Sequence, residues 1–327
     1  ISAICSFLYH YYEFGFIYEN GNYLNFFHFY SSLILLTIFW LIIMVFGINI
    51  EKKLYWFAYY FFIISSINIF WGGIVEFAGF PRSWEIMHHP NYADGHGRPF
   101  GLTGNAAVNS TMLVISYLIM LRSKLKENKQ LNLKWFVLLS TGVVIQQSGS
   151  GLAALLIVVI YYAMSFSLIK KIGMILTTSA IIYIGILNEL EAFYRISPKY
   201  LWWILEWLKK NLLIVWNFEY SQLDFLFGLA VPLGKGNLTT DFGAVYIFNQ
   251  MGFLFLIFVT LLFLRIGLKS KLLIDKLIIF IVFLTGCHYQ IVFFLSSSVI
   301  FSMYIATILS EKKTNKTHII SEKPLVD

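Results

Sequence analysis

Charged residues are scarce in this chain. They make up 13% of its 327 residues, whereas a soluble globular domain carries about 25%. Hydrophobic residues make up 58%, and several apolar runs reach the roughly 20 residues that a helix needs to cross a bilayer. These runs lack the period-two alternation of β-barrel strands. The composition therefore predicts an all-α, polytopic transmembrane helical bundle with about nine or ten spans.

Cysteine is almost absent as well. Cys5 and Cys287 are too few and too far apart for a disulfide framework or a cysteine-based metal site. The phosphate-binding P-loop pattern and the GxSxG pattern of serine hydrolases are also missing. Nothing in the sequence indicates coupling to ATP, and we expect no cofactor.

The net charge of +7 would suit a nucleic-acid-binding protein. It suits a membrane protein better, because basic residues collect in cytoplasmic loops. We expect spans at about 28–49, 54–74, 104–121, 133–145, 152–168, 172–187, 242–264 and 277–309, the last one broken at residues 286–290. If the loop holding Lys52 and Lys53 is cytoplasmic, every lysine and arginine lies on the cytoplasmic side except Arg82, Arg98, Arg195, Lys199, Lys209, Lys210 and Lys235. The basic residues are thus explained without nucleic-acid binding, and we expect none. The spans are expected to form a single transmembrane domain, residues 1–327.

Two long stretches between spans are then expected outside the cytoplasm, at residues 75–103 and 188–240. In the second stretch, Ser197 and Pro198 form a favourable helix start. The segment YLWWILEWLKKNLLIVW follows, with its charged residues on one stripe and Trp, Leu and Ile elsewhere. This pattern favours an amphipathic helix in the membrane interface, although a helix packed against the bundle remains open.

The glycine-rich segment GHGRPFGLTGNAAVNST (95–111) contains one arginine and runs directly into an apolar helix. Guanidinium groups make forked, charge-assisted hydrogen bonds to phosphates, and glycines let the backbone approach a bulky anion. We therefore take Arg98 as the first candidate for binding a phosphate or diphosphate, with Asn105 as a residue that could orient it. The alternative is that Arg98 anchors a helix end to lipid phosphates. Further candidate anion ligands are Arg82, Arg195 and Lys235.

Histidines offer a second kind of site. His88, His89 and His96 could bind a metal, but their spacing is not a tight ligand pattern. His288 beside Cys287 could indicate a thiol nucleophile or an acyltransferase histidine. A structural role is the alternative, and we keep His89 and His288 as supporting candidates without a metal.

Three segments together resemble a known family. RPFGLTGNAAVNSTML (98–113) is similar to the arginine–glycine–GNPN helix start of O-antigen polymerases and O-antigen ligases. SGSGLAALLIVVI (148–160) resembles their SRSGLLALL turn and helix. GKGNLTTDFGAVYIFNQMGFLFLI (234–257) resembles the segment that closes their large periplasmic loop. The order and spacing of the three match the family.

The chain departs from the family pattern at three points. Gly149 stands where an arginine is often found, Ala106 and Ala107 replace the PN dipeptide, and Asp241 replaces the histidine of the ligase loop. Loss of that histidine favours a polymerase over a ligase.

The resemblance implies a GT-C-like glycosyltransferase in the bacterial inner membrane with its active site on the periplasmic side. It would polymerise undecaprenyl-diphosphate-linked oligosaccharide units of O-antigen or a similar surface polysaccharide, with the bilayer and a chain-length regulator as partners. Neither metal nor nucleotide would be needed. Arg98 would stabilise the diphosphate with Arg82 and Arg195, and Asp241 would orient or deprotonate the acceptor hydroxyl; a helix N-cap is the alternative role for Asp241.

Other functions remain open at this point. A ligase is the nearest alternative, and an acyltransferase that uses His288 is another. A flippase or other transporter of lipid-linked oligosaccharides would be expected to have two related halves and charges at mid-membrane. The sequence shows neither feature.

Overall fold

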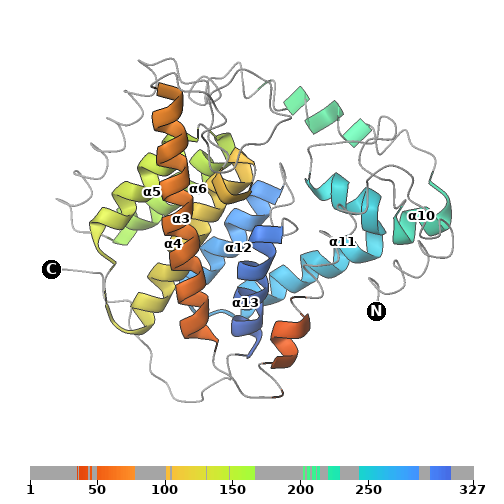
Figure 1. Ribbon diagram of the computed structural model, residues 1–327. Coiled ribbons are helices and arrows are strands. Elements are labelled where there is room, and N and C mark those ends of the chain that lie inside the picture. The colour runs from red at the N-terminus through yellow and green to blue at the C-terminus, as the bar shows by residue number, and fades with distance from the viewer. Residues whose placement is uncertain are drawn as a thin grey trace. The chain divides into compact units, whose positions relative to one another are not determined.

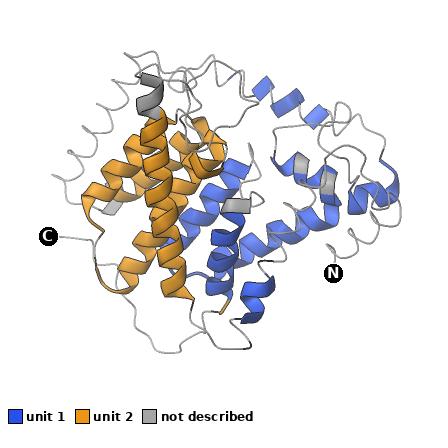
Figure 2. Cartoon of the chain, in the orientation of Figure 1, with its two compact units in different colours: residues 1–48, 201–309 blue, residues 49–200, 310–327 orange. Residues whose placement is uncertain are grey.

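The structure is a computed structural model that describes part of the chain. The described residues are 35, 37–42, 45, 50–77, 101–103, 105–129, 131–146, 148–165, 202, 205, 206, 208–210, 212, 213, 220–228, 243–286 and 295–310. They fall into two compact units (Figure 2). Unit 1 comprises residues 1–48 and 201–309, and unit 2 comprises residues 49–200 and 310–327.

All regular elements of the described residues are helical, which agrees with the all-α prediction. The elements of unit 2 are α3 (Glu51–Phe77), the 3-10 turn η2 (Gly101–Thr103), α4 (Ala106–Lys126), α5 (Leu133–Ile145) and α6 (Gly149–Ser165). The elements of unit 1 are α10 (Gln222–Phe227), α11 (Gly243–Lys269), α12 (Leu273–Gly286) and α13 (Leu295–Ser310) (Figure 1).

Unit 2 is built around α4, against which α3, α5 and α6 pack. Most α4 side chains are fully buried, among them Met112, Tyr117 and Leu118. The Tyr117 hydroxyl lies 2.5 Å from the Tyr162 hydroxyl of α6, and one of the two donates a hydrogen bond to the other. This central helix therefore holds the unit together through both apolar packing and paired polar groups.

The outward faces of these helices are apolar. Along α3 the exposed residues Trp56, Tyr60, Ile64, Ile67 and Trp71 recur every three or four positions, which places them on one face of the helix. In a soluble protein such a stripe would face the core. Here it faces outward, as expected for a helix whose surroundings are lipid.

Three described helices are long and apolar enough to cross a membrane. They are residues 51–72, 106–126 and 251–269. Residues 133–145, 149–162 and 297–310 form shorter apolar helices. Several expected spans are thus confirmed as apolar helices, while those at about 28–49 and 172–187 lie wholly or largely outside the described residues.

Two helix ends differ from the prediction. We expected the third span to stop near Leu121, but α4 continues to Lys126. The reason is Arg122, which is 1% exposed and whose Nη1 donates to Glu51 Oε1 at 2.7 Å. The ion pair lets the helix keep packing against α3 for a further turn after the apolar run has ended. The fifth span was expected from Leu152, whereas α6 begins at Gly149.

Unit 1 contains a broken helix. We expected one continuous span from residue 242, but α11 is interrupted at Gly252, whose φ of 76° and ψ of 177° are not helical. The neighbouring short helix α10 packs against α11. α12 ends at Gly286 and α13 begins at Leu295. The expected break at residues 286–290 lies largely outside the described residues.

The expected amphipathic helix is partly described. The residues between Trp202 and Leu213 that the structure describes are helical. Trp202, Leu205 and Leu212 are exposed large apolar side chains on this segment. A helix that leaves such residues uncovered is compatible with the interfacial location expected from the sequence.

Candidate functional site

Asn105 is the single candidate site residue that falls within the described part of the chain. The others lie outside it: Arg82, His89, Arg98, Arg195, Lys235, Asp241 and His288. The Asn105 side chain accepts hydrogen bonds from the backbone N–H groups of Ala107 and Val108, at 2.9 and 3.1 Å. It is the N-cap of α4. Asn105 therefore fixes the start of the helix that follows the glycine-rich segment.

Asn109, one turn further along α4, is the centre of a buried polar cluster. Its Oδ1 accepts from Ser65 Oγ of α3 at 2.9 Å and from the backbone N–H of Leu102 at 3.1 Å. Its Nδ2 donates to Gln146 Oε1, at the end of α5, at 3.2 Å. Ser65, Asn109 and Gln146 are each completely buried. One amide thus joins α3, the η2 turn and α5 at the same end of unit 2.

Gly101 is required for this arrangement. Its φ of 66° lies in the left-handed region, which side chains rarely adopt. A Cβ at this position would overlap the Asn109 side-chain amide. Because Gly101 has no side chain, the η2 turn can lie directly against Asn109. Gly101 itself follows Arg98 by three residues in the sequence.

The second resembling segment meets the first at this end of unit 2. Ser150 Oγ donates to the Ala107 carbonyl of α4 at 3.4 Å, and it lies 3.0 Å from Ser148 Oγ. A Cβ on Gly151 would overlap the Oγ and Cβ of Ser110. Ser150 and Ala107 are 43 positions apart. The sequence related their two segments only by order, and the structure places them in direct contact.

Gly151→Ala is expected to destabilise unit 2 by about 1–3 kcal/mol, because the added methyl group would have to displace Ser110 in a packed interface. Gly149→Ala is the matched control in the same helix, since a Cβ there meets nothing within 4 Å. Thermal unfolding of the purified variants in detergent measures the difference. Equal unfolding temperatures for the two variants would show that α4 and α6 do not approach as described.

The electrostatics of this end favour an anion. The N-termini of α4 and α6 lie together, and helix N-termini carry partial positive charge. Neither helix has an acidic residue in its first turn. On α3, Asn68 lies one turn beyond Ser65 and is buried, and its Nδ2 has no hydrogen-bond partner among the described residues. The N–H groups of Ala107, Val108 and Gly151 at these helix starts are already paired, so Asn68 Nδ2 is a described donor that remains for a bound molecule.

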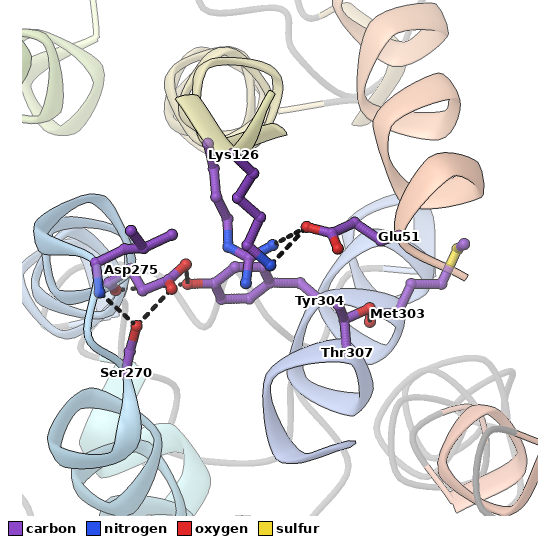
Figure 3. A network of polar contacts seen from close by, with 9 residues as sticks. Glu51, Lys126, Ser270, Asp275, Met303, Tyr304 and Thr307 are labelled. Carbon is purple, nitrogen blue, oxygen red and sulfur yellow. Dashed lines mark hydrogen bonds and ion pairs between the residues drawn. The ribbon is translucent and has the colours of Figure 1, made fainter. Parts of the chain in front are cut away.

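Unit 1 has a buried carboxylate with two hydroxyl partners (Figure 3). Asp275 is fully buried and accepts from Ser270 Oγ at 2.5 Å and from Tyr304 Oη at 2.9 Å. The carboxylate lies in the first turn of α12, where the helix dipole favours negative charge. These contacts join α12 to α13 and to the end of α11, so a structural role accounts for Asp275.

A second polar pair in unit 1 lies beside the α11 break. Tyr220 Oη donates to Asn249 Oδ1 at 2.7 Å. Burial raises the pKa of the Tyr220 hydroxyl to about 12, so it remains a hydrogen-bond donor at neutral pH. Asn249 is buried, and its Nδ2 has no partner among the described residues. The third resembling segment therefore contains a buried amide that can donate to an oxygen of a bound molecule.

No group of three or more His, Cys, Asp or Glu residues in the described ranges could hold a metal ion. Comparison of the chain with protein-family models, curated proteins and solved structures found no match.

Sequence reasoning missed the cluster around Asn109. It selected mainly charged residues and histidines, with Asn105. The residues that organise this end of unit 2 are neutral: Ser65, Asn109, Gln146, Ser148 and Ser150. The feature of the sequence that could have indicated this cluster is the run Asn-Ser-Thr at positions 109–111, within an otherwise apolar helix. An amide buried inside a membrane-length helix is costly unless it is satisfied, so it indicates a partner.

Proposed function

We propose that this protein is a membrane glycosyltransferase that polymerises oligosaccharide units carried on undecaprenyl diphosphate. The proposal rests on the family resemblance of three segments. The observation that supports it best is the contact between the first two segments, through Ser150 and Ala107 and through Gly151 and Ser110. A shared substrate site would require the two segments to lie at the same end of unit 2, as this contact places them.

The chemistry assigns the diphosphate to the first segment. Arg98 precedes the anchored Gly101 by three residues, and a chain of that length spans at most about 11 Å. The first segment therefore carries Arg98 close in sequence to the Asn109 cluster. In this proposal Arg98, aided by Arg82 and Arg195, stabilises the negative charge that develops on the departing diphosphate. Lys235 is a further candidate ligand.

The reaction joins two lipid-linked units. A hydroxyl oxygen of the acceptor sugar forms a bond to the anomeric carbon of the growing chain. The bond between that carbon and the phosphate oxygen breaks, and undecaprenyl diphosphate leaves with the electron pair. Asp241 accepts the proton of the acceptor hydroxyl, a role in which a positioned base contributes about 10²–10⁴-fold.

The environment follows from the same proposal. Three apolar helices of membrane length support a membrane location. We place the protein in the bacterial inner membrane as a multi-pass protein whose Arg98 side is periplasmic, because the excess of basic residues on the opposite loops predicts that orientation. A chain-length regulator is the proposed protein partner.

Incubation of the purified protein with a repeat unit linked to undecaprenyl diphosphate tests the function. A polymerase should convert this single substrate into a ladder of products that differ by one repeat unit. Transfer that requires an added lipid A–core acceptor would instead indicate a ligase. Movement of the intact substrate across a vesicle bilayer, without product formation, would indicate a transporter.

A further inference from the structure

A pocket of about 450 Å³ opens at the other end of unit 2, where α3 begins and α4 ends. Its lining includes Lys52, Lys124 and Lys126 together with the aromatic rings of Tyr55 and Trp56. Along α4, Ser123 of this pocket follows Asn109 by fourteen residues, which corresponds to about 21 Å of helix. The pocket is thus separate from the polar cluster to which the proposed function is assigned.

The charges around the pocket are predominantly positive. Glu51 Oε1 lies 2.7 Å from both Arg122 Nη1 and Lys126 Nζ, so one carboxylate is shared by two cations (Figure 3). Glu127 lies 3.1 Å from Lys129 Nζ and 3.5 Å from Lys124 Nζ. Two carboxylates therefore face a larger set of cations, which are Lys52, Arg122, Lys124, Lys126 and Lys129.

The titration of Glu127 is consistent with this excess of positive charge. The hydrogen bond from Lys129, followed by the charges of Lys124 and Lys129, holds the pKa of the Glu127 carboxyl below its usual value. At the other side of the pocket, Lys52 makes no ion pair with any described residue. Its ammonium group is therefore available to an anion.

The aromatic residues place this pocket at a membrane surface. Lys124 Nζ lies 5.0 Å from the centre of the Tyr55 ring, a cation–π contact. Trp56 is 43% exposed and stacks on Tyr60, with ring centres 5.7 Å apart. Exposed tryptophan and tyrosine next to lysines are typical of the layer where lipid headgroups lie.

An apolar path leads away from the pocket. The exposed stripe of α3 consists of Trp56, Tyr60, Ile64, Ile67 and Trp71, and its first residue, Trp56, lines the pocket. A molecule with an anionic head and hydrocarbon chains could therefore place its head among the lysines and its chains along α3. A free phosphate would use only the first half of this surface.

We propose that this pocket binds the anionic phosphodiester headgroup of a membrane phospholipid. Lys52 and Lys124 contact the phosphate, and the exposed stripe of α3 contacts an acyl chain. Basic pockets beside transmembrane helices have the charge and location needed for such headgroups. The site is independent of the polymerase chemistry, because no residue of the pocket belongs to the proposed catalytic set.

The test compares lipid binding by the delipidated full-length protein. Native mass spectrometry measures how much phosphatidylglycerol and phosphatidylcholine each variant retains. The wild type should prefer phosphatidylglycerol, and Lys52→Gln/Lys124→Gln should lose about 30-fold in that preference, since each lysine near a lipid surface contributes about a factor of five. Lys53→Gln/Lys134→Gln is the matched control, because it removes the same charge from neighbouring residues that do not line the pocket.

Several outcomes would overturn the proposal. An equal loss in the control would show that general surface charge attracts the lipid. If inorganic phosphate alone displaced the bound phosphatidylglycerol completely, the pocket would be a small-anion site rather than a lipid site. Equal retention of phosphatidylglycerol and phosphatidylcholine by the wild type would show that the pocket does not bind an anionic lipid. If the double variant unfolds, the single variant Lys52→Gln replaces it, because this change breaks no ion pair among the described residues. Its preference for phosphatidylglycerol should still fall about fivefold.

Discussion

Arg98→Ala is expected to reduce polymer formation by at least about 10²–10³-fold, because removal of one donor to a developing negative charge has an effect of that size in other enzymes. We expect the protein still to fold, because contacts among Gly101, Leu102 and Asn109 anchor the turn that follows. Polymer length and yield from the purified variant, with the lipid-linked repeat unit as substrate, measure the effect.

Arg98→Lys is the matched variant for this prediction. Lysine keeps the charge but lacks the planar fork that binds two phosphate oxygens at once, so it should retain part of the activity. The same unfolding temperature for wild type and both variants would exclude a folding defect. Wild-type chain length from Arg98→Ala would remove this residue from the site.

Gly252→Ala is expected to have the largest effect on stability. The φ of 76° and ψ of 177° at Gly252 lie in a region that is open almost only to glycine, so any side chain is disfavoured by about 1–3 kcal/mol. An added Cβ would also overlap the carbonyl group of Leu226 and the backbone nitrogen of Gly228. Backbone atoms cannot move aside as a flexible side chain can, so the total should reach about 3 kcal/mol or more. We expect the unfolding temperature to fall by roughly 5–10 °C.

Gly267→Ala provides the control for that measurement. Gly267 lies in the same helix, and a Cβ there would come no closer than 3.8 Å, to Ile279 Cγ2. Its unfolding temperature should therefore match the wild type or rise slightly. If the unfolding temperature fell equally in both variants, α11 would not approach Leu226 and Gly228 as closely as described.

Much of the helical structure could be predicted from the sequence, because it depends on the local distribution of apolar residues. Residues 133–145 were expected as a helix and form α5 with the same bounds. The end of α4 could not be predicted in this way. Its last turn depends on the Arg122–Glu51 ion pair, which joins residues 71 positions apart, and local hydropathy contains no information about such a pair.

The kink in α11 is a second feature that hydropathy conceals. Gly252 lies within a continuous apolar run, and glycine inside a helix is common enough not to predict a break. The break depends on α10, whose backbone occupies the space where a Cβ would lie. The conformation is therefore determined by a tertiary contact.

The candidate site was predictable in part. The resemblance selected residues 98–113 and 148–160, and the structure brings the described parts of these segments into contact. It did not identify Asn109 as the residue that joins α3, η2 and α5. Sequence order alone does not reveal which buried amide meets which hydroxyl or backbone group, because that depends on the packing of four separate segments.

The most direct test of the central claim is the release of undecaprenyl diphosphate by the purified protein. A repeat unit carrying a radiolabelled lipid diphosphate is the only substrate, and free lipid diphosphate and new glycosidic bonds are counted in the same reaction. We predict one lipid diphosphate released for each bond formed by the wild type, and neither product from Arg98→Ala. Bond formation without release, or equal release by the Arg98→Ala variant, would contradict the account.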